Sequence, residues 1–493
     1  MELLSWLGSQ LPSFWNSFIT FGLSFVVYIL VFDHMKRRKR WKNYPPGPVS
    51  FPFVGNLLQV NFQCPRLKFG KIFSLQVGWK NLVVLNGFEA VKAALIQRSE
   101  DFADRPSFSL FDHMVGFSPA APGIMMARYG HGWKELRKFA LSTLRNFGLG
   151  KKSLDQSITE EAGCLCSAFS SKDGHPFNPR FLINSAVGNV MCSITFGNRF
   201  EYNNEKFQRM LQLIEEAFNI GAGILSQVVH KILIVSKTQT SWLPGWHKET
   251  RDPGFTRDFI DAFLEEIEKA KMDPESTFNE DNLIFTVFDL FGAATETTTV
   301  TLCWALLYML RYPDVQSCPI SLHRHLVHEE IDKVIGRDRS PKIEDQVNLP
   351  YTNAAIYETQ RYCDVVFAGV PRMTYRDTQV QDFFIPKGTT VIAVLSSVLK
   401  DETVWEKPHE FYPEHFLDAA GQFVKREAFL PFSAGRRICL GEQLARKELF
   451  LFFTTLLQHF TFHIPEDHPR PQEDGHYVLI HSPDSYELCA IPR

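Results

Sequence analysis

The sequence lacks the marks of several protein classes. Its nine cysteines are scattered, without a Cys-x-x-Cys pair or an even framework, which argues against a disulfide scaffold or a zinc site and favours reduced thiols. It has no basic excess, since the formal net charge is −3, so nucleic acid is not expected as a partner. The chain also has no internal repeat or low-complexity tract, and its 45% hydrophobic content suffices for a large core.

Charged residues are also absent from positions 3–32. The second half of this stretch, FITFGLSFVVYILVF, is strongly apolar, and about 20 such residues cross a bilayer as a helix. The cluster KRRKRWK follows at 36–42, and the positive-inside rule places it in the cytosol. A cleaved signal peptide fits less well, because the basic cluster lies on the wrong side of a long apolar run. We therefore expect a single-pass membrane anchor over residues 1–34.

A basic, proline-rich linker is expected over 35–49, because the adjacent prolines of YPPGP exclude helix and favour stiff polyproline II. No second linker interrupts 50–493, so one large domain is expected there. Alternating β-branched residues predict a hairpin over 72–87 with a turn at 79–81, 383–399 opens as a strand, and SPDSYELCAIP predicts a C-terminal hairpin. Helical periodicity predicts helices over 131–146, 154–170, 205–219, 256–271, 281–311, 349–362 and 442–459. The fold class is therefore mainly α with small β-sheets.

One cysteine stands in an unusual setting, the decapeptide FSAGRRICLG at 432–441. A thiolate is a soft metal ligand and one of the few groups by which proteins hold haem iron. Gly435 and Gly441 would let the backbone approach a flat macrocycle, and amides at the start of a helix near Glu442 would lower the pKa of Cys439. A buried structural cysteine is the alternative, and these ten residues alone do not separate the two.

The pattern Phe432-x-x-Gly435-x-Arg437-x-Cys439-x-Gly441 resembles the haem-binding signature of cytochromes P450 at every fixed position. The resemblance implies the cytochrome P450 fold preceded by one transmembrane helix, with haem b (iron protoporphyrin IX) bound through Cys439. It also implies a monooxygenase of the endoplasmic reticulum membrane that uses O₂ and a lipophilic substrate. Electrons would come from NADPH through NADPH-cytochrome P450 reductase, with cytochrome b5 as a further candidate partner.

The C-terminal part is most similar to the debrisoquine-hydroxylase (D) subfamily of the second, microsomal family, as in IPKGTT and SYELCA. Members of that group oxidise lipophilic amines and other foreign compounds. The substrate implied by the resemblance is therefore a xenobiotic, a basic amine, or a fatty-acid-like or steroid-like endogenous compound.

Glu358 and Arg361 form an i, i+3 pair that faces one side of a helix, with a carboxylate matched to a guanidinium fork. The resemblance implies that the pair is buried and tied to the later stretch FYPEHF, 411–416. There His415 stands where many members have arginine. Its charge, unlike that of arginine, depends on pH.

Trp133 and Arg137 lie one helical turn apart and can donate to one anion. The resemblance assigns them, with Arg372 and Arg437, to the haem propionates. Each alone could be an ordinary exposed residue, but burying two propionates requires several such donors.

The helix predicted over 281–311 carries Asp289, Ala293 and Thr297 on one stripe, at i, i+4 and i+8. The resemblance makes Glu296 and Thr297 the acid and hydroxyl that deliver protons during oxygen activation. A polar turn is the alternative, because threonine is a mediocre helix former. Ala294 departs from the family, which usually has glycine there.

Candidate substrate contacts are Asp289, Ala293, Met125, Phe367 and Val370. Asp289 would attract a protonated amine or would cap the amides of a neighbouring loop, and both readings stay open. Met125 belongs to the apolar, Met-rich segment 108–127, which suits an adaptable pocket wall. Basic residues that could dock an acidic reductase, or could be plain solvated surface, are Lys134, Lys138, Arg145, Lys151, Lys152, Arg436, Arg446 and Lys447.

Three segments depart from the family's spacing, near 60–70, 225–255 and 317–327, the last with Pro319 inside an expected helix. They leave room for an alternative function, a haem-binding but catalytically impaired P450-like protein. A membrane-anchored interaction protein without haem is the third hypothesis.

Overall fold

The computed structural model describes residues 20–32, 43–51, 55–56, 70–77, 80–106, 123–147, 152–219, 247, 249–252, 254–273, 275–316 and 327–493. Most of the three irregular segments lies outside these residues, as do Lys151 and most of the Met-rich segment 108–127. The prediction of a mainly helical fold with small sheets is confirmed.

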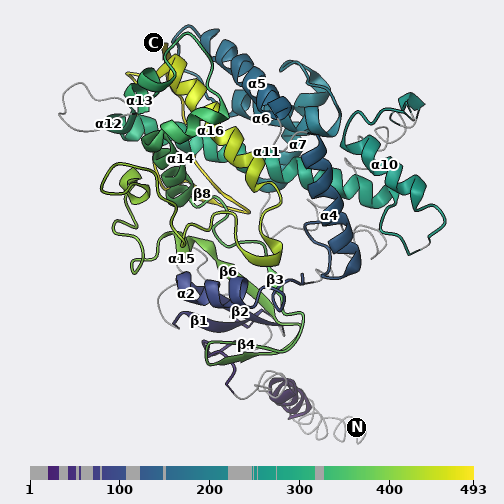
Figure 1. Cartoon of the computed structure of the whole chain (residues 1–493). Helices are drawn as coiled ribbons and strands as arrows, with labels where there is room; N and C mark the ends of the chain where they lie inside the picture. Colours follow the sequence, from purple (N-terminus) through teal and green to yellow (C-terminus); the bar gives the residue numbers. More distant parts are fainter. Residues whose placement is uncertain are drawn as a thin grey trace, which may run out of the picture.

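The centre of the fold is helix α11, Glu280–Arg311 (Figure 1). It starts where the Asn279 side chain accepts a hydrogen bond from the Asn282 amide, a standard helix cap. Its length and apolar composition would suffice to cross a membrane, yet 83% of its most apolar window is buried, as expected of a core helix. It packs against α6, α14 and α16, and α5 covers α6 and α16.

The helices are mostly where periodicity predicts them. The expected helix over 256–271 is shorter, α10 at Phe259–Lys269, because Asp258 caps it by accepting from the Asp261 amide. α6 was not among the predicted ranges. Most of its residues are buried, so its sequence lacks the alternation of polar and apolar faces that predicts a helix. The other helices are α2 Gly87–Lys92, η2 Ala93–Gln97, α4 His131–Asn146, α5 Lys152–Ser170, α6 Arg180–Thr195, α7 Glu205–Asn219, α12 Pro313–Gln316, α13 Val327–Val334, η4 Ile343–Asn348, α14 Pro350–Cys363, α15 Leu395–Leu399, η5 Pro413–Phe416, η6 Gly435–Arg437 and α16 Glu442–His459.

The largest sheet has the order β1-β2-β6-β3 and lies with α2 at the lower end of the body in Figure 1. The predicted hairpin is β1 Ile72–Val77 with β2 Lys80–Asn86. Lys80 and Asn81 pair with Val77 and Gln76, so they belong to β2 and not to the turn predicted at 79–81. β6 Thr390–Val394 is parallel to β2, and β3 Arg372–Met373 is antiparallel to β6. A short antiparallel pair, β4 Thr378–Val380 with β5 Phe383–Ile385, follows β3 in the chain.

The C-terminal region corrects one prediction. SPDSYELCAIP forms no hairpin of its own: β10 Cys489–Pro492 pairs with the distant β7 Phe460–His463. The hairpin lies earlier, between β8 His476–Tyr477 and β9 His481–Ser482. β10 pairs with a strand that is distant in the sequence, because β7, which directly follows α16, offers it an edge.

Near the N-terminus, helix Thr20–Phe32 is apolar and 13 residues are described in it. Large apolar side chains such as Phe21 and Tyr28 are mostly exposed. It is a short candidate membrane span.

Candidate functional site

The loop that carries Cys439 passes very close to the backbone of η2. Gly435 has φ +76°, and a Cβ there would lie 2.0 Å from the Leu95 carbonyl oxygen, so only glycine fits. The Cys439 amide donates to the Phe432 carbonyl at 3.0 Å, which closes the loop before α16 begins. At Gly441 φ is −90° and a Cβ would meet no described atom within 4 Å, so the described protein does not itself require glycine there.

Cys439 forms no disulfide with any described cysteine. The residue keeps surface that solvent can reach, although many protein atoms surround its thiol. Burial raises its pKa, while the amides of Gly441 and Glu442 and the nearby Arg137 lower it. These donors are the ones that a thiolate would need at this position, because they stabilise the ionised sulfur.

Four guanidinium groups gather beside this loop. Three come from the predictions, Arg137, Arg372 and Arg437, and the fourth is Arg105, which sequence reasoning missed. Burial and repulsion between the groups lower the pKa of Arg437 to about 8, that of Arg372 to about 9 and that of Arg105 to about 10. Burial lowers the pKa of Arg137 as well.

The side-chain hydrogen bonds of these arginines, within the described part of the chain, go to neutral oxygens. Arg437 donates to the carbonyls of Ala103, Ile124 and Ala127. Arg105 donates to those of Met125, Val370 and Pro371, Arg137 to that of Ile438, and Arg372 to Ser433 Oγ and the Ala434 carbonyl. The positive charge of the cluster is therefore not neutralised by hydrogen-bonded carboxylates.

Two buried donors of the same cluster, Trp133 Nε1 and Arg372 Nη1, have no hydrogen-bond partner among the described residues. The Arg437 guanidinium lies 4.1 Å from the Trp133 ring centre, so the two side chains are stacked. Buried donors are almost always satisfied in native proteins, so these two point to a bound acceptor. An anion with more than one carboxylate fits the donors, and the two propionates of haem are such a pair.

The stripe on α11 is in place. Ala293 is exposed, Thr297 is half-buried, and the Thr297 hydroxyl donates to the Ala293 carbonyl at 2.8 Å. Ala294 beside them is half-buried.

Glu296 lies on another face of α11. It is 1% exposed and forms an ion pair with Arg180 of α6, whose Nε donates to Glu215 Oε1 of α7 at 2.8 Å. Its second oxygen, Oε2, is buried without a partner among the described residues, and burial raises the pKa of the carboxyl group while Arg180 lowers it. Arg180 and Glu215 were not predicted, and no sequence signal links them to Glu296, which lies far along the chain.

Asp289 adopts the capping arrangement. Its Oδ2 accepts from the amides of Ile124 at 2.7 Å and Met125 at 2.9 Å. Burial raises its pKa to about 6, against the lowering effect of these two amides and of Arg105.

Of the other candidate wall residues, Phe367 packs edge-on against Tyr477, with ring centres 5.1 Å apart. Val370 and Met125 are exposed at 38% and 40%, and Arg105 binds the carbonyl of each. The structure thus brings Asp289, Met125 and Val370 together around Arg105.

The Glu358–Arg361 pair is fully buried, with Arg361 Nη2 2.7 Å from Glu358 Oε1 and Nε 2.8 Å from Oε2. Arg361 also donates to the carbonyls of Leu399, Pro408 and Glu410. His415 completes the network, with Nδ1 3.1 Å from Glu358 Oε2. Its Nε2 accepts from the Lys407 amide at 3.1 Å, so Nδ1 carries the proton and the imidazole fits this place in its neutral form.

The basic residues separate into two groups. Lys134, Lys138, Arg145 and Arg436 are exposed. Lys447 instead pairs with Asp155, and Arg446 pairs with Glu442 and lies 4.8 Å from the Phe432 ring centre. The exposed group is the one available to a partner.

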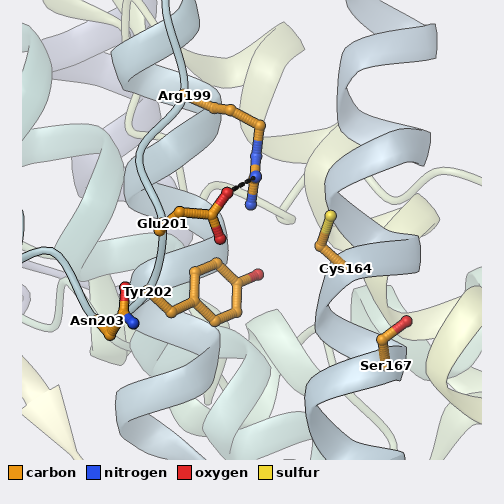
Figure 2. Close-up of a pocket in the computed structure, with 6 residues that line it drawn as sticks. All are labelled: Cys164, Ser167, Arg199, Glu201, Tyr202 and Asn203. Carbon is orange, nitrogen blue, oxygen red and sulfur yellow. Dashed lines mark hydrogen bonds and ion pairs between the residues drawn. The ribbon is translucent and has the colours of Figure 1, made fainter.

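A separate surface pocket of about 440 Å³ lies between α5 and the segment after α6. Figure 2 shows Arg199 reaching Glu201, and the Tyr202 hydroxyl directed across the space toward the helix that carries Cys164 and Ser167. Arg199 is also paired with the buried Glu161 at 3.0 Å. Its charged groups thus neutralise one another, unlike those around Cys439.

The sequence is similar to known proteins along most of its length. The family profile described as Cytochrome P450 matches residues 45–252 and 246–490. Cytochrome P450 2D6 of Homo sapiens is 51% identical over 492 residues, covering 95% of this chain and 97% of the relative. Cytochrome P450 2D15 of Canis lupus familiaris is 50% identical over 497 residues (96% and 98%), and Vitamin D(3) 25-hydroxylase of Sus scrofa is 49% identical over 502 residues (96% and 98%).

Proposed function

Because the chain belongs to the cytochrome P450 family, we propose that it is a haem b monooxygenase and that the Cys439 thiolate would bind the iron. When bound, thiolate-ligated haem supplies the activation of O₂ that places one oxygen atom into an organic substrate. The observation that carries the proposal is the cluster of four guanidinium groups beside Cys439, three of them buried, with two buried donors that have no partner among the described residues. Trp133, Arg105, Arg137, Arg372 and Arg437 would hold the propionates, while Phe432 and Gly435 shape the loop.

On the α11 side, Thr297 would position a proton donor at its Oγ1, on the stripe that also carries the small Ala293. Glu296 would hold a proton at its unpartnered Oε2. Its partners Arg180 and Glu215 are 22% and 34% exposed, so this ion pair would connect the buried acid to solvent. The two residues thus act from neighbouring faces of one helix. Glu358, Arg361 and His415 have a structural role.

The chain would be anchored in the endoplasmic reticulum membrane through residues 1–34, followed by the linker 35–49 and the monooxygenase domain 50–493 in the cytosol. The exposed apolar helix Thr20–Phe32 supports the anchor. Electrons would come from NADPH-cytochrome P450 reductase, docked on the exposed Lys134, Lys138, Arg145 and Arg436, with cytochrome b5 as a second partner.

Reconstitution with the reductase, NADPH and a panel of lipophilic amines and neutral lipophiles, including steroid-like compounds, tests the function. We expect substrate-dependent hydroxylated or dealkylated product. Normal haem incorporation without product from any substrate would instead favour the impaired, non-catalytic reading.

Asp289→Asn is expected to weaken the binding of cationic amines about tenfold and that of neutral substrates less than twofold. One charge–charge contact in a partly solvated cavity is worth roughly 1.4 kcal/mol. Because burial raises the pKa of Asp289 to about 6, the carboxylate is ionised only above that pH, so amine affinity should rise as pH rises through about 6. Substrate-binding spectra against pH measure this. If Asp289→Asn weakened the binding of neutral and cationic substrates equally, Asp289 would serve only to cap the amides of Ile124 and Met125.

A further inference from the structure

We propose that His481 is a protonated positioning residue that fastens the β8–β9 hairpin to the end of α14 and to the candidate substrate wall, residues 367–370. The inference rests on the proposed function only for its substrate readout.

The His481 ring is 3% exposed and meets acceptors at both nitrogens. Nδ1 lies 2.6 Å from the Cys363 carbonyl and 3.0 Å from Asp364 Oδ1, and Nε2 lies 2.8 Å from the Asp474 carbonyl. A neutral imidazole has one N–H, so one lone pair would face a carbonyl oxygen. Only the imidazolium donates on both sides.

The surroundings of the ring favour a cation. Tyr477 stacks on it with ring centres 3.9 Å apart and planes 3° apart, so an aromatic face meets the charge, and the tilted Trp304 ring lies 4.9 Å away. Asp364 is fully buried and lies between His481 and Lys400, whose Nζ is 3.1 Å from Oδ2. Burial keeps the neighbouring thiol of Cys363 and phenol of Tyr308 neutral by raising the pKa of each. The remaining charged groups nearby are paired with others: Glu473 with Arg311, and His476 with Asp484.

The same residue is also bound through its backbone. Its amide donates to the Val365 carbonyl at 2.8 Å, and its carbonyl accepts from Trp304 Nε1 of α11 at 3.2 Å. Gly475 shows how closely the hairpin sits, because a Cβ there would lie 2.8 Å from the Trp304 ring. His481 therefore joins the hairpin to the end of α14 and to the helix that carries Thr297.

The substrate wall follows directly in the chain. Phe367 packs against Tyr477, which itself stacks on the His481 ring. The far end of the wall is held independently, by Arg105 on the carbonyls of Val370 and Pro371. Losing the imidazolium should therefore release the Phe367 end and leave the Val370 end in place.

The test compares His481→Val and His481→Gln with His476→Gln, a matched change at the exposed histidine of the same hairpin. We expect His481→Val to raise KM roughly tenfold, as for the loss of one charge-assisted hydrogen bond, with kcat changed less than twofold. His481→Gln, which keeps an amide donor without the charge, should raise KM less than His481→Val does, and His476→Gln should leave KM unchanged.

Hydrogen exchange of residues 476–482 in the full-length chain in lipid nanodiscs gives a readout without catalysis. Exchange there should be at least tenfold faster in His481→Val than in wild type and unchanged in His476→Gln. Unchanged exchange in His481→Val, or a KM of His481→Val equal to that of wild type, would overturn the proposed role of His481. If the wild-type protein is inactive but the His481→Val variant still exchanges faster, the proposed function is contradicted. The proposed role of His481 in holding the hairpin then still stands.

Discussion

Cys439→Ser is expected to abolish monooxygenase activity and to remove the thiolate signature from the reduced carbon monoxide spectrum. A serine hydroxyl is harder and far more basic than a thiolate, so it cannot supply the electron-rich axial ligand on which oxygen activation depends. The amides of Gly441 and Glu442 and the Arg137 guanidinium would then face a neutral oxygen where they had stabilised a sulfur anion. The loop should keep its shape, because Gly435 and the Cys439–Phe432 backbone bond are untouched.

Cys164→Ser is the matched control, because Cys164 is a free, half-buried thiol on α5 outside this site. It should leave turnover and the spectrum unchanged. Haem content should fall only partly in Cys439→Ser, since the arginine cluster and Trp133 remain. Turnover in Cys439→Ser within twofold of wild type would contradict the assignment of the ligand.

The second large effect concerns stability. Glu358→Gln or Arg361→Ala should lower the free energy of unfolding by about 3–5 kcal/mol, the cost of leaving one partner of a buried ion pair uncompensated. Arg361→Ala also leaves three carbonyls, those of Leu399, Pro408 and Glu410, without their donor. Glu358→Gln weakens the bonds from Arg361, His415 and the Tyr412 amide at once.

The chain provides a control with the same spacing. Glu266 and Lys269 are also an i, i+3 pair, but Lys269 is 66% exposed. Their alanine variants should cost about 0.2–1 kcal/mol because water screens the pair. Urea unfolding of the single and double variants gives both coupling energies. If the coupling energy of Glu358–Arg361 is no larger than that of Glu266–Lys269, the buried pair does not stabilise the protein as expected.

Much of the site could be predicted because its signals are local. The cysteine loop is a contiguous pattern, Glu358 and Arg361 are three residues apart, and the range 281–311 differs from Glu280–Arg311 by one residue. Asn279 caps the start of that helix and Arg311 lies in its last turn, so both ends could be predicted from local sequence signals.

The missed features depend on contacts between distant parts of the chain. Arg105 stands in no periodic pattern, and its role depends on Val370 and Pro371, more than 260 positions away. His481 gains its meaning only from Asp364, Asp474 and Trp304. The choice of β7 as the partner of β10 is equally tertiary. Composition and spacing do not encode such pairings, because any exposed strand edge or carbonyl can accept them.

The reduced carbon monoxide difference spectrum of the wild-type protein in its membrane tests the central claim most directly. Four clustered guanidinium groups, three of them buried, and two buried donors without a described partner beside a free cysteine predict a full complement of haem with the Soret band of thiolate ligation. The absence of a haem–carbon monoxide band in folded protein, or a band unchanged by Cys439→Ser, would contradict it.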